Sequence, residues 1–230
     1  GSESASTSES GSGSGGDSAA FTMPNLMVLS GPTGVGAAKL MADQEYAREN
    51  GSTPDGQHWI VNSTQVVADN TEVAAALTNG DADIAAIATN AAANLYAKTD
   101  GGIQVLAVNT LGVLYILEKG DSVQSMADLA GKTVYATGQG ANPEYVLNYL
   151  LTQNGVDPSQ VDIQWMTAQE VTAQMSSSDS AICMLPVPAA TALMMKDQGV
   201  RHALSLSDEW DKLGQGSLAM GCVVGRTQFI

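Results

Sequence analysis

From residue 25 onward, short apolar runs alternate with longer segments in which apolar residues recur at helical spacing. Most runs are three to five residues long and end at a polar or Gly-rich turn, as buried strands do. Strands that alternate with helices predict parallel α/β units. The expected strands are 26–29, 59–61, 84–87, 105–108, 113–117, 133–136, 163–165, 181–185 and 218–224.

Capping residues mark the expected helices between these strands. Asp69-Asn70-Thr71 provides N-cap chemistry for one helix, and Asn90 is expected to cap the next. Asn142 at the N-cap with Pro143 at the first helical position predicts another helix start. The expected helices are 35–50, 70–77, the segment after Asn90, a short helix ending at Gly131, 142–154 and 168–176.

The two halves of the chain repeat one order of elements. A strand, a Gly-rich turn and a helix occur at 26–50 and again at 133–154. A repeat of about 100 residues is too long for a solenoid unit and indicates two similar α/β lobes. We expect lobe 1 at 23–111, lobe 2 at 112–220 and a return strand at 221–230. Ligands of such sheets bind beyond the carboxyl ends of the strands, so a cleft between the lobes is the expected site.

Residues 1–22 form a different kind of segment. Thirteen of the first twenty residues are Ser or Gly. A segment of this composition cannot bury enough apolar surface to offset the entropy that it would lose on ordering. We expect a flexible linker with two possible origins. It is either a remnant of expression, suggested by Gly1-Ser2, or the tether of an exported lipoprotein, favoured by Glu3, Glu9 and Asp17.

Charge and composition exclude several function classes. Nine Lys and Arg against 24 Asp and Glu give a formal net charge of −15, which opposes binding to nucleic acid or to an anionic membrane. Two His and two Cys provide neither a common zinc-site spacing nor a disulfide framework. We expect Cys183 and Cys222 to be buried free thiols, and we expect no cofactor or metal.

Two Gly-rich turns carry the candidate binding chemistry. The turn from Ser30 to Gly36 resembles a phosphate loop, but Ala37-Ala38-Lys39 replaces the Lys-Ser or Lys-Thr pair that nucleotide hydrolysis needs. Its N–H and hydroxyl groups would face a ligand, or the turn is purely structural. The turn from Thr137 to Gly140 is the counterpart in lobe 2. Because these loops hold few cations, a neutral polar or heteroaromatic ligand is favoured over a charged one.

Several motifs together resemble the solute-binding proteins of ABC importers, in the branch that includes taurine, nitrate and thiamine-precursor binders. They are Ser30–Gly34, Asp83–Asn90, Leu95–Thr99, Asn109–Ile116, Asp128–Lys132, Thr137–Tyr145 and Glu209–Asp211. The resemblance covers about residues 25–230. It implies the two-lobed type II periplasmic-binding fold, in which each lobe is a mostly parallel sheet flanked by helices.

The resemblance also implies where a solute would bind. The implied ligand-binding residues are Ser30, Gly31, Thr33, Gly34, Thr89, Asn90, Thr110, Thr137, Gly138, Gln139, Gly140, Asn142 and Pro186. Asn90 is either a ligand donor or only a helix cap, and the two roles are compatible. The implied hinge glycines are Gly112 and Gly221. Pro186-Val187-Pro188-Ala189 lacks the polar and aromatic residues that family members usually carry at that place.

The implied function is capture of a small molecule and its delivery to a membrane permease, outside the cytoplasmic membrane and attached there by a lipid. The alternatives are a cleft enzyme of the thiamine- or menaquinone-pathway type and a ligand-sensing module. No nucleophile with a neighbouring base is visible, so we expect no enzyme. The C-terminal helices of the family are not apparent after 224. We therefore expect uncovered apolar surface around 26–50 and 84–96 of lobe 1, and either a longer parent protein or cover from a second chain.

Overall fold

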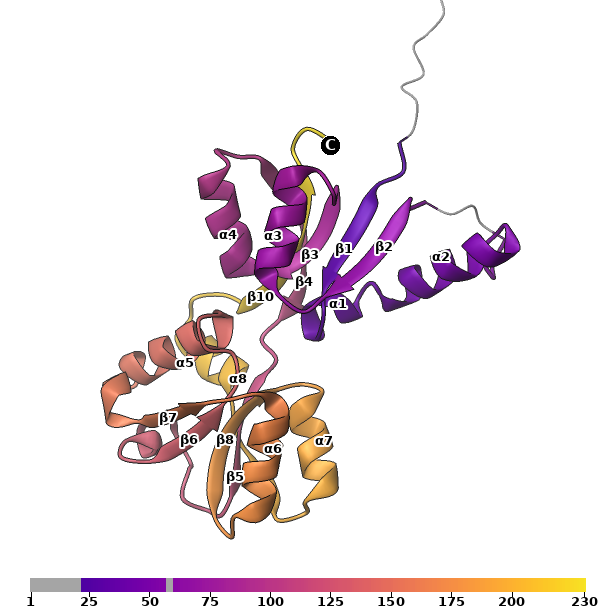
Figure 1. The fold of residues 1–230 in the computed structure, drawn as a ribbon. Helices are drawn as coiled ribbons and strands as arrows, with labels where there is room; N and C mark the ends of the chain where they lie inside the picture. The colour runs from indigo at the N-terminus through magenta and orange to yellow at the C-terminus, as the bar shows by residue number, and fades with distance from the viewer. Residues whose placement is uncertain (1–21, 57–59) are drawn as a thin grey trace, which may run out of the picture.

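The computed structural model describes residues 22–56 and 60–230, which form two lobes (Figure 1). Each lobe contains one five-stranded sheet with helices packed against it. This arrangement confirms the expected two-lobed α/β fold. The predicted linker before residue 22 lies outside the described residues, as do His58 and Trp59.

The sheet of lobe 1 has the strand order β2-β1-β3-β10-β4. Its first three strands pair in parallel, and β10 pairs antiparallel with both β3 and β4. The late strand β10 therefore lies between two strands from the first half of the chain. The strand bounds are β1 (Asn25–Leu29), β2 (Ser63–Val67), β3 (Ile84–Ala88), β4 (Ile103–Leu111) and β10 (Ala219–Arg226).

The sheet of lobe 2 repeats this plan with the order β7-β6-β8-β5-β9. Here β6 pairs in parallel with β7 and β8, while β5 is antiparallel to β8 and β9. Strand β5 thus occupies the position that β10 has in lobe 1, which confirms the internal repeat. The bounds are β5 (Leu114–Lys119), β6 (Thr133–Ala136), β7 (Asp162–Trp165), β8 (Ala181–Pro186) and β9 (Val200–Ser205).

Eight α-helices flank the two sheets within the described residues. In lobe 1 they are α1 (Pro32–Val35), α2 (Ala38–Asn50), α3 (Asn70–Asn79) and α4 (Thr89–Lys98). In lobe 2 they are α5 (Asn142–Gln153), α6 (Ala168–Ser177), α7 (Ala189–Lys196) and α8 (Leu206–Asp211). Two short 3-10 helices, Met126–Leu129 and Pro158–Gln160, complete lobe 2. Buried aliphatic side chains between helices and sheet form a core in each lobe.

The chain passes between the lobes twice. Only Gly112 and Val113 separate β4 from β5, and the return runs from the end of α8 into β10 at Ala219. A Cβ atom on Gly112 would lie 2.1 Å from the hydroxyl oxygen of Ser207. Gly112 therefore permits a close approach of α8 to the first crossover.

The structure corrects four local predictions. Instead of the strand expected at 59–61, the structure has β2 at 63–67. Its first residues, Ser63-Thr64-Gln65, are polar, so the apolar pattern did not predict it. They form a strand because they pair with β1. The helix expected at 35–50 is interrupted at Gly36 and Ala37. The N-caps of α4 and α5 are Ala88 and Ala141, so Asn90 and Asn142 lie one or two positions inside their helices. The pattern did not predict α7, β9 or α8.

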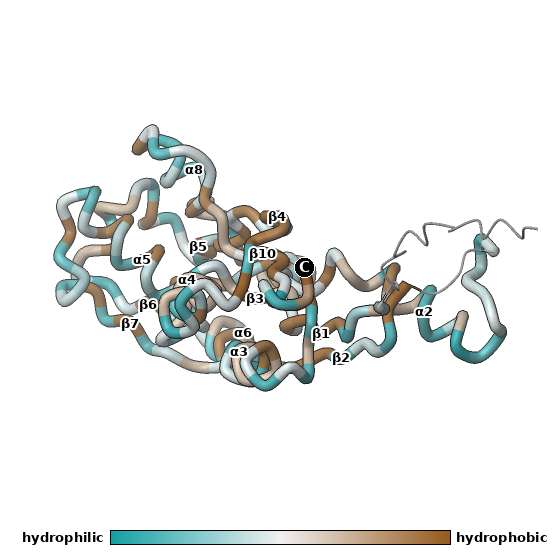
Figure 2. The backbone as a smooth tube through the Cα atoms, turned by 90° about the horizontal axis from the view of Figure 1, so that it is seen from above, coloured by the Kyte–Doolittle hydropathy of each residue, from teal (hydrophilic) through white to brown (hydrophobic). Residues whose placement is uncertain are grey.

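Apolar side chains are exposed along one edge of lobe 1. The edge strand β4, predominantly hydrophobic in Figure 2, exposes Val105, Leu106, Val108 and Leu111 by about half or more. By contrast, Ala85 to Ala88 of β3 are buried. The largest exposed apolar edge of lobe 1 is therefore β4. In the segments predicted to be uncovered, 26–50 and 84–96, Val35, Tyr46 and Tyr96 are exposed by about half or more, whereas most of β3 is buried.

Among the residues that the structure describes, no helix has the length and apolar character that crossing a membrane requires.

Candidate functional site

A cavity of about 170 Å³ lies between the lobes, where the chain leaves the carboxyl ends of β1, β3, β6 and β8. Both lobes contribute to its wall, as expected for a ligand site between α/β lobes. The lining residues are Leu29, Ser30, Pro32, Thr33, Asn70, Ala88, Thr110, Val113, Leu114, Gly138, Ala141, Asn142, Pro143, Pro186 and Met220.

The turn after β1 places Ser30 and Thr33 in this wall. Its shape depends on two glycines, because Gly31 has a φ of +87° and a Cβ on Gly34 would lie 2.1 Å from the carbonyl oxygen of Leu29. Thr33 is buried, and its carbonyl accepts a hydrogen bond of 2.8 Å from the side chain of Asn109. The turn is thereby attached to β4.

Asn70 is a lining residue that the sequence interpretation missed. Asp69 is the N-cap of α3 and accepts a hydrogen bond of 2.6 Å from the N–H of Thr71. Asn70 is therefore not needed as the cap, and its Oδ1 accepts from the N–H of Ala88 at 3.1 Å. The motif Asp69-Asn70-Thr71 was interpreted only as a helix start, although it also follows the carboxyl end of a strand.

The turn after β6 provides the lobe 2 wall. Gly138 has a φ of +95°, and a Cβ there would lie 2.5 Å from Cγ of Pro143, so only glycine fits against the start of α5. Asn142 lines the cavity and donates from Nδ2 to the carbonyl of Met220 at 2.8 Å and to the hydroxyl of Thr89 at 3.2 Å. Asn142 thus connects the two lobes at the cavity wall.

The cavity brings together six of the residues predicted to bind a ligand. They are Ser30, Thr33, Thr110, Gly138, Asn142 and Pro186. Seven others are not among its lining residues. They are Gly31, Gly34, Thr89, Asn90, Thr137, Gln139 and Gly140.

Three of these seven positions, and one predicted hinge residue, have other surroundings. Gly31 and Gly34 line a separate hollow beside α2. Oδ1 of Asn90 is buried and has no hydrogen-bond partner among the described residues. The predicted hinge residue Gly221 lies inside β10, where a Cβ would come within 2.8 Å of the Thr33 hydroxyl oxygen and 3.0 Å of Thr110 Cβ. Gly221 therefore lets α1 and β4 approach β10.

Most of the lining that sequence reasoning missed is apolar. Leu29, Val113, Leu114 and Met220 come from strand ends and from the first crossover. The sequence predicted them only as residues of strands, because only the meeting of the two lobes turns a strand end into a cavity wall. Trp165 and Trp210 are absent from the wall and pack against the core of lobe 2.

The reactive side chains lie outside the cavity. Cys183 and Cys222 are buried free thiols, as predicted, and burial raises the pKa of Cys183 to about 12. Within residues 22–56 and 60–230, no cluster of His, Cys, Asp and Glu has the arrangement of a metal site. No acid, base or thiol lines the cavity in the part of the chain that the structure describes, so the contacts that these residues offer are hydrogen bonds and apolar packing.

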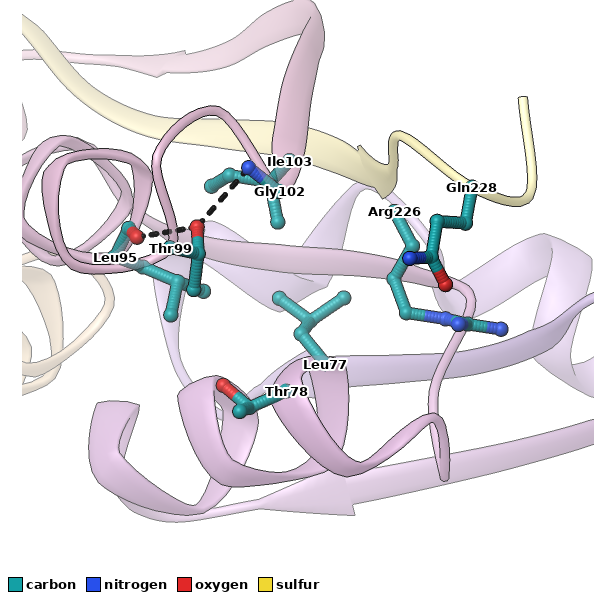
Figure 3. Close-up of a pocket in the computed structure, with 8 residues that line it drawn as sticks. All are labelled: Leu77, Thr78, Leu95, Thr99, Gly102, Ile103, Arg226 and Gln228. Atoms are coloured by element: carbon teal, nitrogen blue, oxygen red, sulfur yellow. Dashed lines mark hydrogen bonds between the residues drawn. The ribbon is translucent and has the colours of Figure 1, made fainter.

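A second cavity, of about 200 Å³, lies within lobe 1 alone (Figure 3). Leu77 and Leu95 project into it from α3 and α4, and Ile103 comes from β4. Its one charged lining group, the guanidinium of Arg226, is paired with Asp83. This cavity lies between the helices and the sheet of one lobe, whereas residues of both lobes line the other cavity.

The fold is shared with solved structures of periplasmic binding proteins. The aliphatic sulphonate binding protein SsuA from Escherichia coli superposes with a TM-score of 0.66 at 14% identity, over 89% of this chain and 65% of that one. An ABC transporter structure from Parabacteroides distasonis superposes with a TM-score of 0.66 at 25% identity, over 90% of this chain and 67% of that one. The alkanesulfonate-binding protein SsuA from Xanthomonas axonopodis pv. citri, bound to MOPS, superposes with a TM-score of 0.54 at 15% identity. The match covers 89% of this chain and 65% of that one.

These likenesses place the protein in the class of two-lobed periplasmic-binding-protein folds, and it spans about two-thirds of the length of those structures. A model of the NMT1/THI5-like family matches residues 62–213. The protein belongs to this family. No protein with curated annotation matched the sequence.

Proposed function

We propose that this protein is the solute-binding component of an ABC importer and captures a small molecule in the cavity between its lobes. The observation that carries the proposal is the composition of the cavity wall, to which the ends of strands from both sheets contribute. A ligand held there contacts both lobes at once, so binding is coupled to the position of one lobe relative to the other. A membrane permease that recognises the closed form would receive the solute.

The wall supports binding over the enzymatic alternative. A nucleophilic hydroxyl needs a neighbouring base to activate it. Ser30, Thr33 and Thr110 offer hydroxyls, but no His, Cys, Asp, Glu or Lys lines the cavity within the described residues. Such a wall can orient a solute and release it unchanged.

We further propose that the protein lies outside the cytoplasmic membrane and is held there by a lipid anchor on the N-terminal side of residues 1–20. The Ser- and Gly-rich composition of that segment suits a tether that lets the lobes reach a permease. Detergent phase partition of the protein from its native cells tests the anchor. Recovery in the detergent phase supports it, and recovery in the aqueous phase contradicts it.

Native mass spectrometry tests binding. The purified protein is incubated with a soluble small-molecule extract of bacterial cells, below about 1 kDa, and then desalted. We expect a 1:1 adduct with the wild type and with Ala173→Phe, a control on an exposed position of α6. Ala141→Phe should lose the adduct because its ring fills the cavity. An adduct that survives Ala141→Phe would place binding elsewhere, and no adduct with any form would contradict the function.

A further inference from the structure

Within residues 22–56 and 60–230, every group that lines the cavity between the lobes is uncharged. Five of its lining residues have polar side chains, and these are hydroxyls or amides. They are Ser30, Thr33, Asn70, Thr110 and Asn142. The other lining residues are aliphatic, Met, Pro or Gly. We infer that the solute bound here is an uncharged molecule with an apolar body and both a hydrogen-bond donor and an acceptor. This inference rests on the proposed function.

No cationic side chain is available to an anion at this site. All nine Lys and Arg residues of the chain lie within the described residues, and none lines the cavity. Six are in ion pairs, namely Lys39, Arg48, Lys119, Arg201, Lys212 and Arg226. The remaining three are Lys98 in the last turn of α4, Lys132 directly before β6 and Lys196 in the last turn of α7. The net charge of −15 further opposes the approach of an anion.

Several backbone donors beside the cavity are already used within the protein. In the lobe 2 turn, the N–H of Gly140 donates to the carboxylate of Glu144 at 2.5 Å, and that of Ala141 donates to the Gly138 carbonyl. In the lobe 1 turn, the N–H of Ser30 donates to the carbonyl of Val67 at 2.7 Å. An anion here would lose its hydration without gaining a cationic partner, which is costly.

A cationic solute is disfavoured for the complementary reason. Burying an ammonium group requires a carboxylate partner or an aromatic face. Among the residues that the structure describes, the lining includes no Asp, Glu, Phe, Tyr or Trp. These lining residues can therefore replace the hydration of an uncharged solute but not that of a charged one.

Two side-chain amides set the hydrogen-bonding pattern of the solute. Oδ1 of Asn70 accepts from Ala88, while its Nδ2 has no hydrogen-bond partner among the residues that the structure describes. Asn142 has the opposite arrangement, because its Nδ2 donates to Met220 and Thr89 and leaves Oδ1 as an acceptor. The solute should therefore present an acceptor to Asn70 and a donor to Asn142, as an amide, a lactam or a hydroxylated heterocycle does.

The test separates the small-molecule extract by charge at pH 7 into three fractions, retained on an anion exchanger, retained on a cation exchanger, or retained on neither. Native mass spectrometry with each fraction, followed by accurate mass of the released compound, identifies what binds. We expect an adduct from the unretained fraction only, with an uncharged compound. A bound acid, base or zwitterion overturns the inference and leaves the proposed function standing. No adduct from any fraction overturns both.

A pair of variants then tests the role of Asn70 with the compound so identified. Asn70→Asp retains the acceptor for the Ala88 N–H but replaces the free donor with a negative charge. We expect its Kd to rise at least tenfold by calorimetry. Asn79→Asp adds the same charge at the exposed far end of α3 and should leave the Kd within twofold. Equal Kd values for the two variants would overturn the assignment of Asn70.

Discussion

Asn142 of lobe 2 donates a hydrogen bond of 3.2 Å to the hydroxyl of Thr89 in lobe 1, beside the cavity that both lobes line. The same amide nitrogen lies 2.8 Å from the carbonyl oxygen of Met220, at the start of the strand that returns to lobe 1. One side chain of α5 thus makes two contacts at the boundary between the lobes. Each such hydrogen bond contributes about 1 kcal/mol net, enough to affect an equilibrium between open and closed forms.

We predict that Asn142→Ala shifts the unbound protein toward an open arrangement. The substitution removes both hydrogen bonds of Nδ2 and leaves α5 otherwise intact. Small-angle scattering should show a larger radius of gyration than for the wild type. Gln153→Ala, at an exposed position of the same helix, is the matched control. Superimposable scattering curves for Asn142→Ala and the wild type would mean that this contact does not hold the lobes together.

Glu118 should make stability depend on pH. Its buried carboxylate accepts from Arg201 at 2.5 Å, from the N–H and hydroxyl of Ser122 and from the N–H of Val123. Burial alone would raise the pKa of Glu118, but these hydrogen bonds outweigh it and lower the pKa below 4.5. Because the pKa is lower in the folded state, this contribution is present above about pH 4.5 and is lost as the pH falls through the folded value.

Urea unfolding at a series of pH values between 7 and 3 measures this dependence. Glu118→Gln should cost about 3 kcal/mol at pH 7, because it leaves a partly buried Arg201 without its main partner. Its unfolding free energy should also fall less steeply with acid than that of the wild type. Parallel pH profiles for the two proteins would exclude Glu118 as a source of the acid sensitivity.

Three glycines of one turn should respond differently to alanine. Gly34→Ala should destabilise by about 2–3 kcal/mol, because its Cβ would meet the backbone oxygen of Leu29 at 2.1 Å. Gly31→Ala meets no atom but has a φ of +87°, so it should cost about 1 kcal/mol. Gly36→Ala has open space and a φ of −60°, and should be neutral or stabilise by about 0.5 kcal/mol. Thermal unfolding of the three variants gives the order, and a Gly34→Ala variant as stable as Gly36→Ala would refute the close contact.

The two cysteines should resist thiol reagents in the folded protein. Burial raises the pKa of the Cys183 thiol to about 12 and also raises that of Cys222, so little of the reactive thiolate exists at pH 8. We expect mass spectrometry to find neither residue alkylated by iodoacetamide in buffer and both alkylated in 6 M guanidinium chloride. Rapid alkylation of Cys183 in buffer would contradict its burial.

The order of elements was accessible from the sequence because it rests on local physics. Buried parallel strands read as short apolar runs such as Ile84–Ala88, and caps such as Asp69 and Ser125 satisfy backbone groups within a few residues. The repeat of the two halves was visible for the same reason. It implied two similar lobes, and the matching orders of the two sheets confirm this.

Strand β2 and the interior position of Asn90 were not accessible from the sequence. Ser63-Thr64-Gln65 becomes a strand only because β1 offers it a parallel partner across the sheet. Asn90 resembles an N-cap by residue type, but the strand before it continues to Ala88 and shifts the helix start. Both outcomes depend on contacts between residues far apart in the chain, which local preferences do not encode.

The sequence by itself determined the class of fold and the two Gly-rich turns that provide part of the cavity wall. Those turns are local, because a positive φ at Gly31 or Gly138 and a close approach at Gly34 are properties of a few residues. Only the tertiary structure decided which side chains share a cavity. Asn70 and Met220 are 150 positions apart and become neighbours in the wall because β10 inserts between β3 and β4 and the lobes meet at its start. Such proximity results from the packing of whole sheets, so no pattern within one segment reports it.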